Sequence, residues 1–240
     1  QPVCRLVCDR ALAWRWGDLY YLGIVPWAVS GGGAHGTWEA IGEEMLEMGV
    51  TMWLAPGMNI HRNPLCGRNF EYYSEDSMLT NILGKAVCQG AQSKGLMAAV
   101  KHFAYNHQET NRSGMSVFFT EQAARENELR GFQGAMAENI AGGAMTAFNR
   151  VGVDYSGASR NLLEQITRNE WGYTGAYVTD MINGADYMNW RDIVFGGGGG
   201  CLTTSAYESA NIGSMTSTEN LKLIAKDSAF QKKMKETIKY

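Results

Sequence analysis

Charged, polar and aromatic residues are crowded into the stretch from Asn59 to Asp76, which reads NIHRNPLCGRNFEYYSED. Polar groups this dense are costly to bury unless they have partners. A sugar would provide partners, because its site needs charged hydrogen-bonding groups for the hydroxyls and aromatic rings for the apolar ring face. Arg68 and Glu71, together with Lys101 and His102, supply the charged groups. The aromatic residues near them in the sequence are Phe70, Tyr72, Tyr73, Phe103 and Tyr105.

Asp180 is the candidate for the carboxylate that acts at an anomeric carbon, because it ends a predicted strand and would be rigidly aimed. Ordinary structural explanations also exist: Arg68 could form a loop ion pair with Glu71 or Glu75, and Asp180 could cap a helix. We expect no metal site and no serine-hydrolase site, because the sequence has no H-E-x-x-H, C-x-x-C or G-x-S-x-G motif. The residues alone leave the choice between a sugar enzyme and an α/β binding domain open.

Amphipathic segments alternate with short apolar runs along the chain and predict the elements that would position these groups. Apolar residues at helical spacing begin at Trp38 and predict a helix that stops at Gly49. The same spacing predicts helices at residues 79–87, 121–137 and 159–171. Buried strands are predicted at residues 51–55, 96–100, 144–148 and 175–178. Helices that alternate with strands imply an α/β fold with a parallel sheet.

Polar residues follow each predicted strand directly. They are Asn59 and His61, Lys101 and His102, Asn149 and Arg150, and Thr179 and Asp180. The carboxyl ends of the strands in parallel α/β folds face the ligand site. We therefore predict that four strand ends deliver polar groups to one concave surface.

The composition argues against several partners. The net charge is only -3, without a basic field, so we expect no nucleic acid. No apolar run reaches the ~18 residues of a membrane span. The run from Gly196 to Gly200 lacks the G-K-[ST] ending of a phosphate-binding loop, so we interpret it as a flexible loop and expect no cofactor. Residues 219–239 are predicted to form one Lys-rich, packed helix.

Four segments, in the same order along the chain, resemble glycoside hydrolase family 3, the β-glucosidase group. They are LAPGMNIHRNPLCGRNFEYYSED (54–76), KHFAYNHQETNR (101–112), MTAFNRV (145–151) and LLEQITRNEWGYTGAYVTDM (162–181). The resemblance implies a TIM-like (β/α) barrel, possibly incomplete, for residues 38–240, and it leaves residues 1–37 as an unmatched N-terminal segment. It also implies hydrolysis of terminal β-D-glycosidic bonds in a carbohydrate substrate.

The family's motifs imply roles at the matching positions. Asp180 matches the catalytic nucleophile, whereas Lys101, His102 and Arg68 match groups that hold the sugar hydroxyls, with Glu71 orienting its neighbours. The implied mechanism is retaining: Asp180 forms a glycosyl-enzyme, and a second carboxylic acid, about 5–5.5 Å away, protonates the leaving oxygen and then activates water. We expect Lys101 and Arg68 to favour the ionised form of Asp180.

The sequence departs from the family's pattern at two points of the sugar site. Met181 stands where many members have a Trp that walls the site, which leaves the substrate preference open. The Asp that grips sugar hydroxyls from the first barrel strand has no match in residues 1–37.

The acid/base is the third departure. In the family it is a Glu from a following α/β sandwich domain, which these 240 residues do not contain. His107 lies one position late for the histidine that compact members use, so we do not expect it to be the acid/base. The carboxylates to compare with Asp180 are those of Asp76, Glu109 and Asp186. The alternatives to an active enzyme are a non-catalytic sugar-binding barrel and a fragment that needs a missing domain, a partner chain or a second copy.

Overall fold

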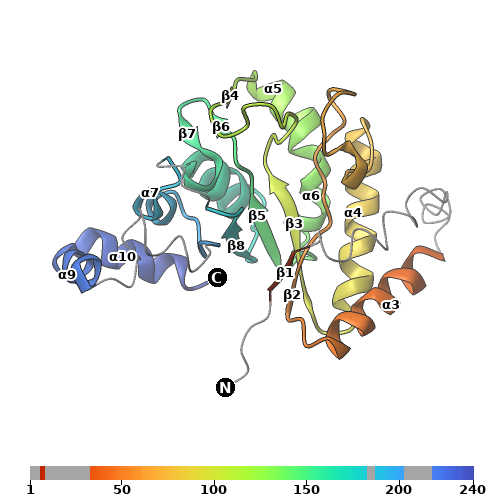
Figure 1. The fold of residues 1–240 in the computed structure, drawn as a ribbon, viewed down its shortest axis with the longest axis horizontal. Coiled ribbons are helices and arrows are strands. Elements are labelled where there is room, and N and C mark those ends of the chain that lie inside the picture. The colour runs from red at the N-terminus through yellow and green to blue at the C-terminus, as the bar shows by residue number, and fades with distance from the viewer. Residues whose placement is uncertain (1–5, 9–32, 183–186, 203–217) are drawn as a thin grey trace.

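The computed structural model describes residues 6–8, 33–182, 187–202 and 218–240. Its centre is a five-stranded parallel sheet in the order β1-β2-β3-β5-β8 (Figure 1). The strands are β1 (Leu6–Cys8), β2 (Met52–Leu54), β3 (Met97–Phe103), β5 (Gly143–Thr146) and β8 (Ala176–Thr179). This is the predicted α/β architecture, an incomplete TIM-like barrel.

Helices connect the strands as the alternating pattern predicts. They are α3 (Gly33–Glu47), α4 (Ser77–Gln92), α5 (Glu121–Ala123), α6 (Arg130–Ala137), α7 (Trp190–Phe195), α9 (Thr218–Lys226) and α10 (Ser228–Thr237), with two π-helical segments, η3 (Ala124–Glu128) and η5 (Asn161–Glu170). The predicted stop after the first helix is correct, because Gly49 has a φ of 72° that favours glycine. Short 3₁₀ turns, η2 (Asn69–Glu71) and η4 (Ser156–Ala158), complete the helical elements of the described residues.

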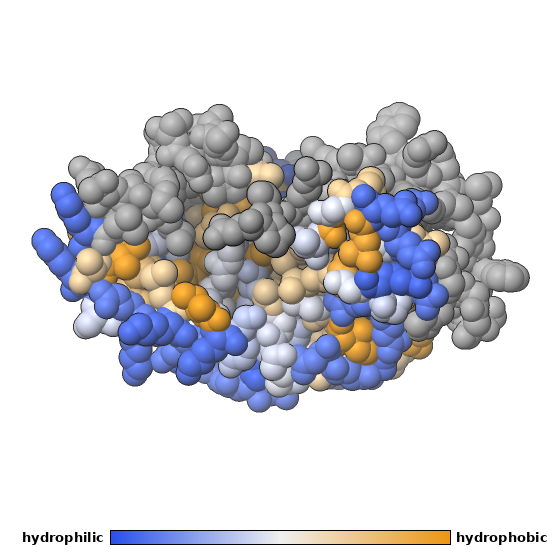
Figure 2. All heavy atoms as spheres, turned by 90° about the horizontal axis from the view of Figure 1, so that it is seen from below, coloured by the Kyte–Doolittle hydropathy of each residue, from blue (hydrophilic) through white to orange (hydrophobic). Residues whose placement is uncertain are grey.

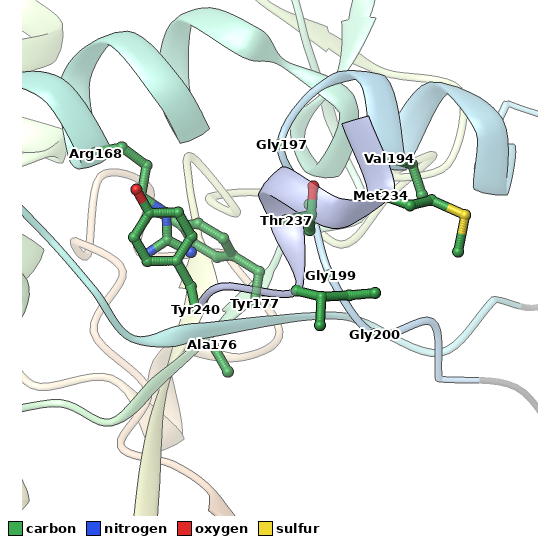
Figure 3. Close-up of a pocket in the computed structure, with 12 residues that line it drawn as sticks. Arg168, Ala176, Tyr177, Val194, Gly197, Gly199, Gly200, Met234, Thr237 and Tyr240 are labelled. Carbon is green, nitrogen blue, oxygen red and sulfur yellow. The ribbon is translucent and has the colours of Figure 1, made fainter. Parts of the chain in front are cut away.

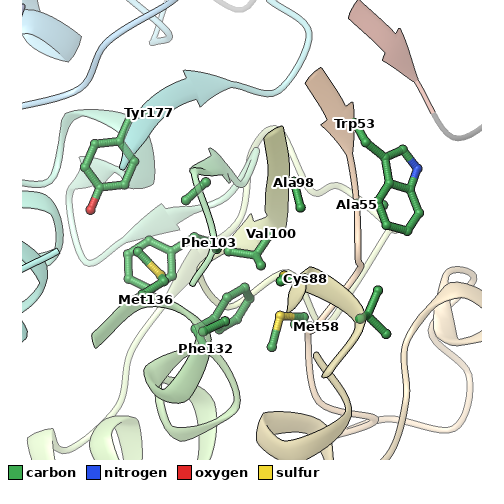
Figure 4. Packing of buried hydrophobic residues seen from close by; sticks show 14 of the residues in the cluster. Trp53, Ala55, Met58, Cys88, Ala98, Val100, Phe103, Phe132, Met136 and Tyr177 are labelled. Atoms are coloured by element: carbon green, nitrogen blue, oxygen red, sulfur yellow. The ribbon is translucent and has the colours of Figure 1, made fainter. Parts of the chain in front are cut away.

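Strands β2, β3, β5 and β8 bury both of their faces. Trp53, Val100 and Tyr177 belong to the large core that α4 and α6 cover, where Phe103 packs edge-on against Phe132 with ring centroids 5.2 Å apart (Figure 4). The alternate residues form a separate buried cluster on the other face: Leu54, Ala99, Met145 and Val178. Successive strand residues point to opposite faces, so burial on both sides explains why the strands read as continuous apolar runs.

The glycine run from Gly196 to Gly200 is not the flexible loop that its composition predicts. Gly200 pairs in parallel with Val178, and its N–H donates to the Tyr177 carbonyl at 2.8 Å. A Cβ on Gly198 would lie 2.7 Å from the carbonyl oxygen of Gly157. The glycines therefore permit close backbone packing next to β8, and it is this packing that fixes the segment.

The C-terminal helical region also differs from its prediction. Two helices, α9 and α10, replace the single helix expected over residues 219–239. Asp227 separates them and caps α10, because its Oδ1 accepts a hydrogen bond from the Phe230 N–H at 2.9 Å. Phe230 is buried against Trp190, which confirms that this region packs onto the domain.

Two features of the sheets were not predicted. The strand β1 lies in the unmatched N-terminal segment and pairs in parallel with β2, with Leu6 opposite Met52. The sequence also contains a short apolar run from Leu22 to Val29, which lies outside the described residues. Above the carboxyl ends of the main strands, β4 (Ser116–Val117), β6 (Arg150–Val151) and β7 (Asp154–Tyr155) form a second, three-stranded sheet (Figure 1).

Viewed from below, at the amino ends of the strands, the described surface has a largely hydrophilic lower rim and separate hydrophobic patches (Figure 2). None of the helices in the described part of the chain is long and apolar enough to cross a membrane.

Candidate active site

The predicted site residues come from three strands. Arg68 precedes η2 in the loop after β2, Lys101 and His102 lie near the end of β3, and Asp180 directly follows β8. The carboxyl ends of these parallel strands lie on the same side of the sheet, where β4, β6 and β7 are found (Figure 1). The Lys101–His102 and Phe103–Ala104 peptide bonds are cis.

Glu71 holds two cations of the site. Its Oε1 accepts a hydrogen bond from Arg68 Nε, and its Oε2 lies 3.2 Å from Lys101 Nζ. The Lys101 side chain is only 2% exposed and that of Glu71 is 12% exposed. Burial alone would raise the pKa of Glu71, but Lys101 and Arg68 outweigh burial and lower the pKa. The carboxylate is therefore ionised and orients both cations.

Both ring nitrogens and both backbone polar atoms of His102 lie within hydrogen-bond distance of a partner. Its Nε2 lies 2.9 Å from Arg68 Nη2, and its Nδ1 lies 3.0 Å from Tyr72 Oη. Asn59 fixes the backbone, since its Oδ1 accepts from the His102 N–H at 2.8 Å and its Nδ2 donates to the His102 carbonyl at 2.9 Å. Burial, with Arg68, Lys101 and Arg112 nearby, puts the pKa of His102 well below 6.5. The imidazole is neutral at physiological pH.

Asp180 is half-buried, and one of its carboxylate oxygens is buried without a partner. Its N–H donates to the Thr146 carbonyl at 3.1 Å, and its Oδ1 accepts from the Met181 N–H at 2.7 Å. Its Oδ2 lies 3.5 Å from His102 Nε2 and has no hydrogen-bond partner among the described residues. A buried oxygen without a partner is unusual, and it marks the point where a bound donor would be most favourable.

Arg68 and Lys101 favour the ionised form of Asp180, as expected, but burial has the larger effect on its pKa. Burial raises its pKa, and the Met181 N–H, Arg68, Arg112 and Lys101 offset burial only in part. The side chain is 16% exposed, so it has lost most of its hydration, which favours the protonated form.

The aromatic residues occupy different places from those the sequence suggested. Phe103, Tyr105 and Tyr73 belong to or pack against the large core, and Tyr72 is buried against His102. Of the five rings, only that of Phe70 is exposed, at 61%. The Met181 side chain packs against the buried cluster of Phe148, Tyr155, Ile182, Met188 and Ile193.

The carboxylates compared with Asp180 have other partners. Asp76 caps α4, accepting from the Met78 N–H at 2.7 Å, and Glu109 accepts from Arg112 Nη1 at 2.7 Å. Asp186 lies outside the described residues. The imidazole of His107 pairs with the buried carboxylate of Glu128.

A separate hollow of about 300 Å³ lies beside the amino-terminal half of β8, away from the end that carries Asp180 (Figure 3). Its wall includes Arg168, whose guanidinium carbon is 4.5 Å from the ring centre of Tyr177 and 4.0 Å from that of Tyr240.

Sequence reasoning missed the positioning roles of Tyr72 and Asn59. Tyr72 was placed among the rings for a sugar face, and Asn59 was only one of several polar residues after a strand. Their adjacency to Arg68 and to the strand end was the available signal, but the partner of each side chain comes from a different loop or strand.

The fold and the site together define a class of protein. A parallel α/β sheet that gathers a half-buried carboxylate, a neutral histidine and paired cations at the carboxyl ends of its strands has the arrangement of a barrel-type active site.

The chain belongs to glycosyl hydrolase family 3: the model of the family's N-terminal domain matches residues 34–192. The chain is 44% identical over 175 residues to beta-glucosidase A of Butyrivibrio fibrisolvens, which covers 72% of this chain and 19% of the relative. It is 37% identical over 153 residues to an exo-alpha-(1->6)-L-arabinopyranosidase of Bifidobacterium longum, covering 64% of this chain and 20% of that relative.

Solved structures agree with this membership. The structure is similar to beta-glucosidase 3B from Thermotoga neapolitana in complex with alpha-D-glucose, with a TM-score of 0.78 and 35% sequence identity. The match covers 86% of this chain and 28% of that chain. The chain thus spans about a fifth of the length of its curated relatives and just over a quarter of this solved neighbour.

Proposed function

We propose that this chain carries the nucleophile and some of the sugar-binding residues of a retaining β-glucosidase-like hydrolase that cleaves terminal β-D-glycosidic bonds. Asp180 attacks the anomeric carbon, and the group of Arg68, Lys101 and His102, oriented by Glu71, binds the sugar. Because a relative in the same family is an arabinopyranosidase, membership leaves the identity of the sugar open.

The unpartnered Oδ2 of Asp180 is the observation that carries this proposal. A buried carboxylate oxygen without a hydrogen bond is unfavourable for folding. It lies 3.5 Å from the imidazole of His102, which itself contacts Arg68. A sugar hydroxyl would supply the missing donor, and an anomeric carbon above the same oxygen would be in position for attack.

We further propose that the acid/base carboxylic acid lies outside the described residues. Glu109 and Asp76 are the two described carboxylates singled out in the sequence, and each already accepts hydrogen bonds from its own neighbours. A retaining enzyme needs a second carboxyl group about 5–5.5 Å from its nucleophile. A further domain, a partner chain or a second copy could supply this group.

A substrate with a good leaving group tests the nucleophile without the acid/base. Incubation of the chain with a dinitrophenyl β-D-glucoside should release one equivalent of dinitrophenol in a burst, because such a phenol leaves without protonation. Mass spectrometry should then find a glucosyl unit on the peptide that contains Asp180. Azide, which attacks without base assistance, should release a glucosyl azide of β configuration.

Asp180→Asn should abolish the burst and preserve glucose binding in calorimetry. The matched control is Asp192→Asn, which removes an exposed carboxylate of α7 and should keep the burst. A full burst from Asp180→Asn would exclude Asp180 as the nucleophile. Glucose binding by the wild-type chain without any burst would support the alternative of a non-catalytic sugar-binding barrel.

A further inference from the structure

The hydroxyl of Tyr72 connects His102 to a second buried amide. Tyr72 Oη lies 3.0 Å from His102 Nδ1 and 2.9 Å from Asn106 Nδ2. The orientation of the Asn106 amide is fixed by Glu109, whose Oε1 lies 3.3 Å from the same Nδ2. Because an ionised carboxylate only accepts hydrogen bonds, the atom that faces it must be the amide nitrogen, which therefore donates to Tyr72.

The contacts of His102 determine which ring nitrogen carries the proton. Arg68 has only hydrogen-bond donors, and its Nη2 lies 2.9 Å from His102 Nε2. Nε2 must therefore be unprotonated to accept that bond. A neutral imidazole carries one proton, which leaves it on Nδ1, where the Tyr72 oxygen can accept it.

We propose that Tyr72 is a positioning residue that, with Arg68, locks His102 in the neutral Nδ1–H tautomer. Arg68 then donates to His102, and both His102 and Asn106 donate to the Tyr72 oxygen. The guanidinium of Arg68 is thus fixed at Nε by Glu71 and at Nη2 by His102. Tyr72 acts on a bound sugar only through His102 and Arg68. In this tautomer Nε2 of His102 accepts hydrogen bonds and does not donate a proton.

This tautomer has a consequence for Asp180. The Nε2 lone pair and Asp180 Oδ2 are both acceptors and lie 3.5 Å apart without a proton between them. His102 therefore cannot satisfy Asp180, which is consistent with an Oδ2 that lacks a partner. The importance of this arrangement for catalysis rests on the proposed function, but the tautomer itself does not.

Long-range ¹H–¹⁵N correlation of the imidazole rings measures the tautomer directly, and it requires neither sugar nor turnover. The chain has four histidines, so His102→Gln assigns the signal. The wild-type chain at pH 7 should show a protonated, pyrrole-type Nδ1 and an unprotonated, pyridine-type Nε2. A protonated Nε2 in the wild-type chain would overturn the proposal, even if the burst from a dinitrophenyl glucoside is observed.

Two variants separate the contributions of the neighbours. Arg68→Met removes the donor that faces Nε2, so the proton should move to Nε2, from which it can reach Asp180. Tyr72→Phe removes the acceptor of the Nδ1 proton and should shift or broaden the His102 signals, with glucose bound roughly fivefold more weakly, as expected for one hydrogen bond.

The matched control is Tyr177→Phe, which removes the hydroxyl of another buried tyrosine, one whose partner is Thr167. It should leave the His102 signals unchanged. If Tyr72→Phe also left them unchanged, Tyr72 would not be the residue that holds the Nδ1 proton. A shift of equal size in Tyr177→Phe would assign the effect to general loosening of the core and likewise reject the proposal.

Discussion

The carboxylate of Glu71 lies between Lys101 and Arg68, and its removal is expected to destabilise the fold far more than loss of a surface charge. The Lys101 side chain is 2% exposed, that of Glu71 12% and that of Arg68 20%. Glu71→Gln keeps the shape of the side chain but removes the negative charge that both Lys101 and Arg68 contact. Breaking a buried ion pair at one partner costs about 3–5 kcal/mol of unfolding free energy.

The control is a pair of the same chemistry on the surface. Lys85 and Glu138 are 31% and 54% exposed, so Glu138→Gln should cost no more than about 1 kcal/mol. Urea unfolding of both variants at pH 7, followed by tryptophan fluorescence, gives the two free energies. The double variant Glu71→Gln/Lys101→Met should lose less than the sum of the single losses, because each single variant already removes the interaction that the two side chains share.

Acidification should reproduce the effect of the substitution. The pKa of Glu71 is lowered in the folded chain from its ordinary 4.5, so the unfolded chain binds its proton more readily. The stabilisation is therefore complete above the unfolded pKa and is lost as the pH falls through the folded one. If Glu71→Gln cost no more than Glu138→Gln, the cluster would be solvated and the reasoning from burial would fail.

Two further variants test the buried histidine and the glycine run. The pKa of His102 lies well below 6.5 in the fold, so below pH 6.5 the unfolded chain binds the extra proton, and the unfolding free energy should fall by up to about 1.4 kcal/mol per pH unit. Urea unfolding measured over this pH range should show a smaller slope in His102→Gln. Gly198→Ala should lower the unfolding free energy by about 1–3 kcal/mol in the same assay, because its Cβ would lie 2.7 Å from the Gly157 oxygen. In the control Gly114→Ala the nearest atom lies 3.7 Å from the new Cβ, so this variant should unfold like the wild type.

The fold was predictable where it depends on hydrophobic periodicity. The alternating helices and strands are present within a few residues of their expected bounds, because β2, β3, β5 and β8 are buried on both faces and the helices between them pack apolar residues onto the core. The glycine run was misinterpreted because its composition resembles a linker. Its order comes from contacts of Gly198 with Gly157 and of Gly200 with Val178, which no local pattern contains.

The sequence predicts which residues form the candidate site, but it does not predict which of their side chains contact one another. The rule that parallel strands end on one side brought Arg68, His102 and Asp180 together. The same rule does not say which side chain turns inward. Tyr72 became a partner of His102, and Phe70, two residues earlier, became exposed. Pairing depends on the path of the loop after β2, which the apolar pattern does not encode.

The protonation of Asp180 depends on a balance that only packing decides. Arg68 and Lys101 favour the carboxylate, and both could be named from the sequence, but the loss of hydration at this position outweighs them. A ligand that donates a hydrogen bond to Oδ2 would add a further interaction with the charged form alone. By linkage, such a ligand lowers the pKa of Asp180 and binds more tightly as the pH rises through it. On the proposed function, the substrate would then help to ionise the group that attacks it, so a raised pKa in the unliganded chain is compatible with a nucleophile.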